Sequence, residues 1–310
     1  MVVSVGKVVD ALGTSAPSIA RLRPWFRDEQ PESWMPLISR WHYFESLLVE
    51  LIERCRDDYD KGRDRIAMLP LASAALGPPL PHPGSRIFAS GGNFAEHAKK
   101  MSSQQVSKDA PGKLGEFPPW GFYVIPGTVV GHGMTVVPPR GTQKLDYEAE
   151  VAVVFGGRSP AAAGDRFEVW GYTAWNDFSI RDAALGLSRT DHGPLTWSLT
   201  KNFRTGNSCG PWMVIGHDLD LKNVRIRSWV NGEPRQDGTT ADMIYSFDDT
   251  ARYISEYLPI SAGDMVLSGT PAGTAMEGGI DGPYLSDGDR VEVLVDGVST
   301  LTNTVQLDSE

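Results

Sequence analysis

Short apolar runs, separated by glycine, proline and polar residues, follow one another along the chain from Gly121 onward. Runs of this length between turn residues are typical of β-strands. A helical pattern in this part is convincing only over residues 248–258, with Asp248 as the expected N-cap. The pattern therefore predicts a β-rich α+β domain rather than repeated β–α–β units. Its strands are expected at residues 122–125, 128–130, 134–137, 147–155, 169–175, 212–215, 224–230, 265–268 and 291–295.

The beginning of the chain has a different pattern. Between residues 34 and 65, apolar residues including Leu47, Leu51 and Ile52 recur at spacings of three and four, which predicts a helix. Residues 76–84 then read Leu-Gly-Pro-Pro-Leu-Pro-His-Pro-Gly, which breaks any regular element and indicates a linker. We therefore expect a partly helical N-terminal extension over residues 1–78 and a main domain over residues 79–310.

A short apolar run at residues 87–93 ends in a glycine turn, and a helix is expected to begin near Asn93. Residues 99–119 are polar and contain Ser, Gln, Gly and Pro. They predict a long loop, and long loops in compact domains are more often functional than idle. We expect this loop to be a lid.

Composition narrows the classes of function. The chain has 29 basic and 39 acidic residues, a formal net charge of −10, which argues against a general nucleic-acid surface. A local basic pocket for an acidic small molecule remains possible. Two cysteines, Cys55 and Cys209, give neither a disulfide framework nor a thiolate zinc site. With no apolar run near the ~18 residues of a membrane span and an opening unlike a signal peptide, the expected location is cytoplasmic.

The strongest chemical signal is the segment Leu-Asp-Tyr-Glu-Ala-Glu-Val-Ala-Val-Val-Phe at residues 145–155. Because strand side chains alternate faces, Asp146, Glu148 and Glu150 point one way, and neighbours on that face lie roughly 6.5–7 Å apart at the backbone. The oxygens of the two glutamates can therefore converge on one cation. The alternative is the solvated outer face of an amphipathic strand.

Three further residues could complete such a site. Asp177 follows an expected strand and could be a third ligand, or the cap of a turn. Lys201 could lie beside the acidic cluster, or on the surface. Thr270 stands between glycines after another strand, where backbone N–H and hydroxyl donors could approach a ligand, or simply form a tight turn. Three carboxylates without paired Cys or His favour Mg²⁺ or Mn²⁺ over Zn²⁺.

Six segments between Pro79 and Val305, taken in order, resemble the fumarylacetoacetate hydrolase (FAH) superfamily, including its acylpyruvate hydrolases and 2-hydroxyhepta-2,4-diene-1,7-dioate isomerases. The segments are SRIFASGGNFAEHAKKM, RGTQKLDYEAEVAVVFG, GYTAWNDFSIRD, LTKNFRTGNSCGPWMV, VNGEPRQDGTTADMIYS and AGDMVLSGTPAG. The resemblance implies a fold of mixed sheets that form a roll or barrel-like core, a homodimer, and one Mg²⁺ or Mn²⁺ per subunit.

The resemblance also assigns roles. It implies that the metal ligands are Glu148, Glu150 and Asp177. The active-site lysine would be Lys201, and the candidate general base would be His97, because imidazole titrates near neutrality. The residues expected to bind the substrate are Arg181, Gly269 and Thr270.

Two positions depart from the family pattern. Many small members carry Glu three residues after the histidine, where this chain has Lys100, and many carry Gln where it has Ala184. A cation close to His97 would disfavour imidazolium and weaken the base. A replacement carboxylate could come from Glu277 or from Glu116.

The implied activity is hydrolysis of a carbon–carbon bond in an acylpyruvate-type 2-oxo acid, through a metal-chelated substrate and a water activated by His97. Lys100 favours an alternative within the family, decarboxylation or keto–enol isomerisation of a 2-oxo acid. A non-catalytic binder of small molecules is a further alternative. The expected partner is a small 2-oxo acid, with neither nucleic acid nor membrane involved.

Aromatic residues are frequent near these segments and hint at a bulky or ring-derived substrate. Core packing is the plainer explanation for them. The residues concerned are Trp120, Phe122, Tyr123, Trp175 and Trp197.

Overall fold

The computed structural model describes residues 2–3, 9, 16–25, 35–63, 68–69, 76–80, 84–103, 117–156, 166–188, 193–216, 220–298 and 300–307. The chain divides into two compact units, Met1–Ala75 and Leu76–Glu310. Among the residues described, no helix is both long and apolar enough to cross a membrane. The two cysteines are free and buried.

The first unit is built around α4 (Trp41–Asp60), a 20-residue helix that buries Phe44, Leu47 and Leu51. The helical prediction for this region is confirmed, although Ile52 is half exposed rather than part of the buried face. The other elements of the unit are short: β1 (Val2–Val3), α2 (Pro17–Ala20), η1 (Arg23–Trp25), α3 (Met35–Ile38) and β2 (Met68–Leu69).

The second unit contains a seven-stranded mixed sheet and a five-stranded mixed sheet. The larger sheet runs in the order β4 (Gly121–Val124), β3 (Ile87–Ser90), β14 (Met265–Leu267), β8 (Ala149–Phe155), β9 (Val169–Asp177), β11 (Asn207–Ile215) and β5 (Val129–Val130). The smaller runs β13 (Glu233–Thr239), β12 (Arg225–Val230), β15 (Arg290–Val295), β16 (Leu301–Val305) and β6 (Thr135–Val136). A two-stranded ribbon pairs β7 (Leu145–Asp146) with β10 (Ser179–Ile180).

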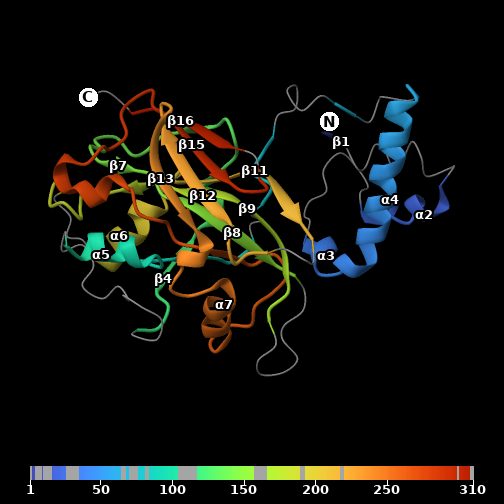
Figure 1. The fold of residues 1–310 in the computed structure, drawn as a ribbon, viewed down its shortest axis with the longest axis horizontal. Helices are drawn as coiled ribbons and strands as arrows, with labels where there is room; N and C mark the ends of the chain where they lie inside the picture. Colours follow the sequence, from blue (N-terminus) through green and yellow to red (C-terminus); the bar gives the residue numbers. More distant parts are fainter. Residues whose placement is uncertain are drawn as a thin grey trace. The chain divides into compact units, whose positions relative to one another are not determined.

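The two large sheets lie one over the other, with β12 and β15 crossing β8 and β9 (Figure 1). Val151 and Val153 of β8 and Val293 and Val295 of β15 belong to one buried apolar cluster. Since strand side chains alternate faces, this packing leaves the opposite face of β8 free for Glu150. The predicted β-rich fold of mixed sheets with few helices is confirmed.

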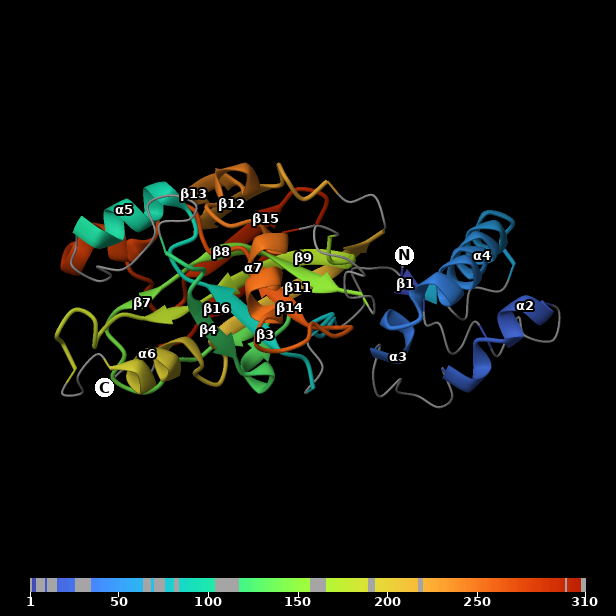
Figure 2. The same cartoon turned by 90° about the horizontal axis from the view of Figure 1, so that it is seen from below.

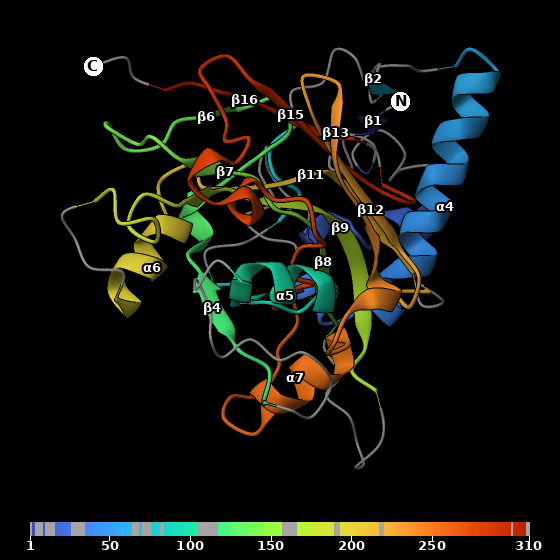
Figure 3. The same ribbon diagram turned by 60° about the vertical axis from the view of Figure 1, so that its left-hand side comes forward.

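Few helices accompany these sheets. They are α5 (Ala95–Ser103), α6 (Pro194–Lys201) and α7 (Phe247–Ser255), with the short 3₁₀ turns η3 (Pro126–Thr128), η4 (Thr240–Asp242) and η5 (Ala275–Asp281). Helix α5 lies beside η5 (Figure 2). Helix α6 lies beside β4 (Figure 3).

Two local predictions were wrong. The cap of α7 is Ser246, whose hydroxyl accepts a hydrogen bond from the N–H of Asp249 in a capping box, so Asp248 lies inside the helix. Residues 99–103 belong to α5 rather than to a loop. The rest of the predicted lid, residues 104–116 with Glu116, lies outside the described part of the chain.

Asn93 fixes the start of α5 on the larger sheet. Its buried side-chain amide donates to the carbonyls of Tyr245 and Ser268, at 3.0 and 2.8 Å, and accepts from the N–H of Tyr245 at 2.8 Å. All three bonds join segments far apart in the sequence. They hold the helix that carries His97 next to the end of β14.

Candidate active site

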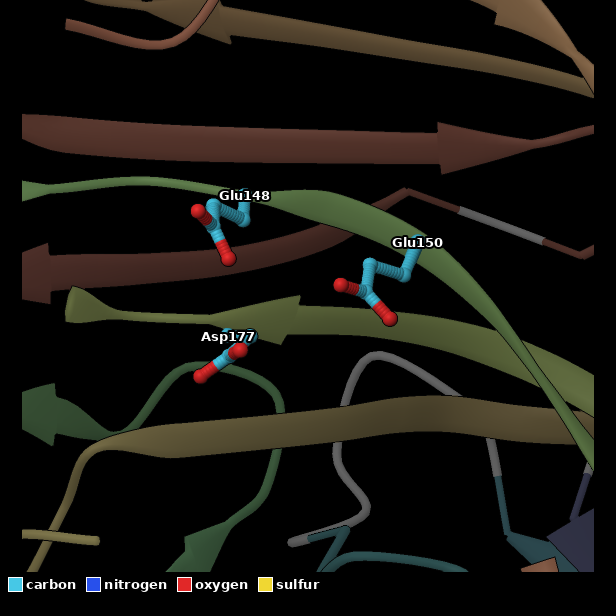
Figure 4. A group of neighbouring side chains, drawn as sticks. All are labelled: Glu148, Glu150 and Asp177. Carbon is cyan, nitrogen blue, oxygen red and sulfur yellow. The ribbon is translucent and has the colours of Figure 1, made fainter. Parts of the chain in front are cut away.

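Three carboxylates meet where β8 and β9 of the larger sheet adjoin, with Glu148 directly before β8, Glu150 on β8 and Asp177 at the end of β9. One oxygen each from Glu148, Glu150 and Asp177 lies within 4.8 Å of the others. Strands β8 and β9 are antiparallel, and the N–H of Asp177 donates to the carbonyl of Glu148 at 3.0 Å, so the end of one strand meets the start of the other. Figure 4 shows Glu148 and Glu150 on the same side of their chain segment, facing Asp177. All three are buried, so the solvated-face alternative is wrong.

Two buried cations lie against this cluster. The ammonium of Lys201 donates to Asp177 at 2.8 Å and also contacts Glu148, while the guanidinium of Arg181 donates to Glu148. Lys201 and Arg181 are only 5% and 6% exposed. The structure therefore places Lys201 in the interior, at the end of α6, and not on the surface.

Asp146 is a further buried acid of the cluster that received no role from the sequence. It accepts a hydrogen bond from Nε of Arg181 at 3.0 Å. It also accepts from the N–H groups of Ala275 and Met276, at 2.7 and 3.2 Å, in the first turn of η5. One carboxylate thus holds both the guanidinium beside Glu148 and the turn that carries Glu277. Its position on the same face as Glu148 was the available signal.

Gly269 and Thr270, which were expected to bind the substrate, form hydrogen bonds within the protein. The N–H of Gly269 donates to Glu150 at 3.1 Å, and a side chain at Gly269 would be strained because its φ is +75° and a Cβ would approach the carbonyl oxygen of Ser90. The hydroxyl of Thr270 donates to the carbonyl of Ala149 at 3.0 Å and accepts from Gln236 at 2.6 Å. A substrate carboxylate would have to replace the bond from Thr270 to Ala149.

His97 pairs with Glu277. Nδ1 of His97 lies 2.7 Å from Oε1 of Glu277, and both side chains are buried. The N–H of Gly273 donates to both oxygens of this carboxylate at 3.0 Å, and the ammonium of Lys100 lies 3.3 Å from Oε2. Because these neighbours are donors, Glu277 is best satisfied as an ionised acceptor of the proton on Nδ1. That tautomer leaves Nε2 as the basic nitrogen.

Lys100 contacts carboxylates on both sides. Its ammonium lies 3.0 Å from Glu96 as well as 3.3 Å from Glu277, and it is half exposed. Although burial opposes ionisation, the hydrogen bond from His97 and nearby positive charge lower the pKa of Glu277. Glu277 thus supplies, between His97 and Lys100, the carboxylate that the family pattern has at position 100.

The acidic cluster and the histidine share one pocket. It is formed by α5, α6, β4 and the ends of β8 and β9, and it opens beside the glycine turn after β3. Its lining residues are Ser90, Gly91, Gly92, His97, Ala98, Met101, Trp120, Phe122, Glu148, Glu150, Asp177, Ile180, Arg181, Ala184, Trp197, Thr200, Lys201 and Thr270. The base, the three carboxylates and both cations could therefore act on one small molecule.

Burial makes the protonation states of the carboxylates unequal. Burial, together with Asp177 and Glu148, raises the pKa of Glu150 well above its ordinary value. Burial raises the pKa of Asp177 to about 7. Although burial opposes it, Lys201 and Arg181 hold the pKa of Glu148 below its ordinary value. The cluster is therefore short of positive charge.

The residues present fit a hard divalent cation. The donor set consists of three carboxylates, which are the ligands that Mg²⁺ and Mn²⁺ prefer. One oxygen of Asp177, Oδ1, is buried without a hydrogen-bond partner, which is costly unless something binds it. A cation contacting this oxygen would satisfy it and supply the missing charge.

Comparison with known proteins identifies the family of the chain. Residues 86–306 match the family model for the fumarylacetoacetate (FAA) hydrolase C-terminal domain. The chain belongs to the fumarylacetoacetate hydrolase family. The matched range contains the three carboxylates, both buried cations, His97 and Glu277.

Members of the family that are similar to this chain are named for different reactions. The chain is 34% identical over 233 residues to the Escherichia coli homoprotocatechuate catabolism bifunctional isomerase/decarboxylase, which covers 74% of this chain and 48% of that protein. This chain thus spans about half the length of that relative. It is 31% identical to the oxaloacetate tautomerase YisK of Bacillus subtilis, over 77% of this chain and 75% of the relative.

A solved structure extends the likeness beyond the matched family domain. It is a probable 2-hydroxyhepta-2,4-diene-1,7-dioate isomerase from Mycobacterium abscessus, with a TM-score of 0.67 and 27% identity. The match covers 90% of this chain and 91% of the other. The family therefore includes isomerases and decarboxylases beside the hydrolases, and membership alone does not choose between them.

The acidic cluster generates a test of metal binding. We expect Glu150→Gln and Asp177→Asn each to weaken Mn²⁺ binding by about 100-fold or more, because each removes one carboxylate ligand. Calorimetric titration measures the loss. A matched control is Asp182→Asn, since Asp182 is also buried but accepts hydrogen bonds from the N–H groups of Gln143 and Lys144. Equal Mn²⁺ affinity in all four proteins would contradict the assignment.

The raised pKa values predict how metal binding depends on pH. Below its pKa of about 7, Asp177 is protonated in the metal-free protein, and an ion must displace that proton. The affinity for Mn²⁺ should therefore fall by about tenfold per proton displaced for each pH unit below 7, and recover above it. Titrations at pH 6, 7 and 8 measure this dependence. A Kd that stays constant over this range would show that the carboxylates bind the ion without releasing a proton.

Proposed function

We propose that this chain is a divalent-metal-dependent enzyme that transfers a proton at the carbon next to the keto group of a 2-oxo acid. The observation that carries the proposal is the hydrogen bond between His97 and Glu277, because His97 lines the same pocket as the three carboxylates. A histidine oriented by a carboxylate is a suitable general base, and a 2-oxo acid is a suitable ligand for a cation beside it.

The carboxylates of Glu148, Glu150 and Asp177 would hold Mg²⁺ or Mn²⁺. Such an ion, when bound, supplies Lewis-acid polarisation of the keto and carboxylate oxygens of the substrate. Lys201 and Arg181 line the same pocket and would face the negative charge that develops on the enolate oxygen. Since their charge is already fixed in a buried site, they stabilise the enolate without reorganising.

Proton transfer itself falls to His97. Its Nε2 would take the proton from the carbon next to the keto group, leaving an enolate and an imidazolium. The carboxylate of Glu277 stabilises the imidazolium through Nδ1. Return of a proton to carbon then gives the keto form, and return to oxygen gives the enol. His97 and Glu277 would therefore serve tautomerisation in either direction.

Decarboxylation uses the same parts. When the substrate carries a carboxylate on the carbon next to the keto group, the bond to that carboxylate breaks, CO₂ leaves, and the electron pair becomes the enolate. A proton taken from water then reaches the carbon through Nε2 of His97. The printed names of the relatives from Escherichia coli and Bacillus subtilis, an isomerase/decarboxylase and a tautomerase, support this class of reaction.

Hydrolysis of an acylpyruvate is the second candidate. The same histidine–carboxylate pair would serve it, because Glu277 supplies the carboxylate that Lys100 does not. Water deprotonated by His97 would attack the distal carbonyl, and the carbon–carbon bond would break to a carboxylic acid and an enolate. Tautomerisation needs no water in the pocket, whereas this reaction does.

Product analysis tests the proposal and separates the candidates. Enol oxaloacetate, oxaloacetate and an acylpyruvate series are each supplied with Mg²⁺, Mn²⁺ or a chelator. We expect metal-dependent loss of enol absorbance, release of CO₂, or both, with products identified by mass. Two acids from an acylpyruvate would establish hydrolysis instead. If chelator and metal give the same rates with every substrate, the pocket is a binder and the proposal is wrong.

The paired histidine makes a separate prediction. We expect Glu277→Gln to lower kcat by about 10²–10⁴-fold with little change in KM, because the base loses the group that fixes its tautomer. His97→Asn should lower kcat similarly. The double variant should be no slower than the slower single variant, since the two residues act as one unit. Steady-state kinetics measure all three, and fully additive losses would contradict a joint role.

A further inference from the structure

One wall of the pocket is apolar and largely aromatic. It faces the carboxylate cluster from β4, α5 and α6. Trp175, by contrast, is fully buried in the core, and Tyr123 is 44% exposed. Of the five aromatic residues that the sequence suggested, three therefore line the pocket, and Trp175 and Tyr123 do not. The wall consists of Ala98, Met101, Trp120, Phe122, Ile180 and Trp197.

The ring of Trp197 contacts the other two aromatic rings, and the wall reaches the acidic cluster. The ring of Trp197 lies 5.6 Å from that of Trp120, at 34°, and 5.0 Å from that of Phe122, at 75°. The ammonium of Lys201 lies 5.5 Å from the centre of the Phe122 ring. A substrate held beside Lys201 would therefore extend along these rings.

The position of Trp120 depends on a glycine. A Cβ built at Gly91 would lie 2.7 Å from the indole of Trp120, and the N–H of Gly91 donates to the carbonyl of Trp120 at 2.9 Å. The indole thus packs directly on the backbone of the glycine turn that lines the pocket. Trp120 and Trp197 are half-buried, so their faces are not fully used by protein packing.

The lysine and arginine side chains of the described pocket lining already pair with carboxylates of the protein. Among the described residues that line the pocket, the lysine and arginine side chains are Lys201 and Arg181. Lys201 donates to Glu148 and Asp177, and Arg181 donates to Glu148 and Asp146. A second substrate carboxylate lying on the aromatic wall would lose its hydration without gaining an unpaired cation from the described lining, which is costly.

We infer that the substrate is a 2-oxo acid whose distal substituent is flat and uncharged, such as an aromatic ring, and not a second carboxylate. This inference rests on the proposed function, because it takes the 2-oxo acid end to be held at the carboxylate cluster. Stacking on Trp120 and Trp197 gives such a substituent favourable contacts that a carboxylate cannot make.

Phenylpyruvate and oxaloacetate form a suitable pair of probes, since both exchange a proton at the carbon next to the keto group and differ in the distal group. With Mg²⁺, we expect kcat/KM for tautomerisation to be about tenfold or more higher for phenylpyruvate. Trp197→Ala should lower that value about tenfold, mainly through KM, and lower the value for oxaloacetate by a clearly smaller factor. Trp197→Phe should restore most of the loss.

A variant that adds charge tests the inference in the opposite direction. Ala184 lines the pocket on the turn after β10, and Ala184→Arg would bring a cation to it. We expect its ratio of kcat/KM, oxaloacetate over phenylpyruvate, to rise about tenfold. This variant also serves if Trp197→Ala does not fold.

The outcomes separate the inference from the function. Preference for oxaloacetate in the unchanged protein, or equal losses for both substrates in Trp197→Ala, would overturn the inference while leaving the function intact. Absence of metal-dependent turnover with either substrate would overturn the proposed function. Calorimetric binding of the two acids to the Mg²⁺-loaded protein would then still decide the inference, which requires tighter binding of phenylpyruvate.

Discussion

The charge balance of one buried cluster governs this domain. Four carboxylates, those of Asp146, Glu148, Glu150 and Asp177, are buried with two cations, Arg181 and Lys201. Burying charge without a partner costs several kcal/mol per ion, so a cluster with more acids than bases either keeps protons or binds a cation. The raised pKa of Asp177 and of Glu150 expresses this shortage in the metal-free protein. A bound divalent cation would relieve this shortage of positive charge, and the chemistry proposed for the pocket depends on that cation.

The fold supplies the geometry that the cluster needs. Antiparallel pairing of β8 with β9 brings Asp177 to the glutamates, and the packing of the two sheets buries the other face of β8. Asp146 joins this part to the turn bearing Glu277, while Asn93 anchors the helix bearing His97. His97 and the acidic cluster thus line one pocket. His97 also pairs with Glu277, although 180 residues separate the two in the sequence.

Sequence patterns predicted the parts of this structure that depend on local alternation and missed those that depend on distant contacts. The run from Leu145 to Phe155 gave the strand and the shared face of its glutamates. Strands β13 and β16 and helix α6 were not predicted, because β13 and β16 are rich in polar residues and α6 is only eight residues long. The cap of α7 was placed two residues late because Asp248 and Ser246 are both good caps, and the local capping box of Ser246 with Asp249 was overlooked. Nothing local marks Asp146 as the link between Arg181 and η5, and Glu277 was only one of two candidates by position.

A structure of the protein crystallised with Mn²⁺ tests the central claim most directly. Anomalous scattering locates the ion without assumption about its ligands. The account predicts one ion bound by oxygens of Glu148, Glu150 and Asp177, with Oδ1 of Asp177 among them and His97 facing the same pocket. An ion bound elsewhere, or a cluster that stays closed by Lys201 and Arg181 alone at saturating Mn²⁺, would contradict it.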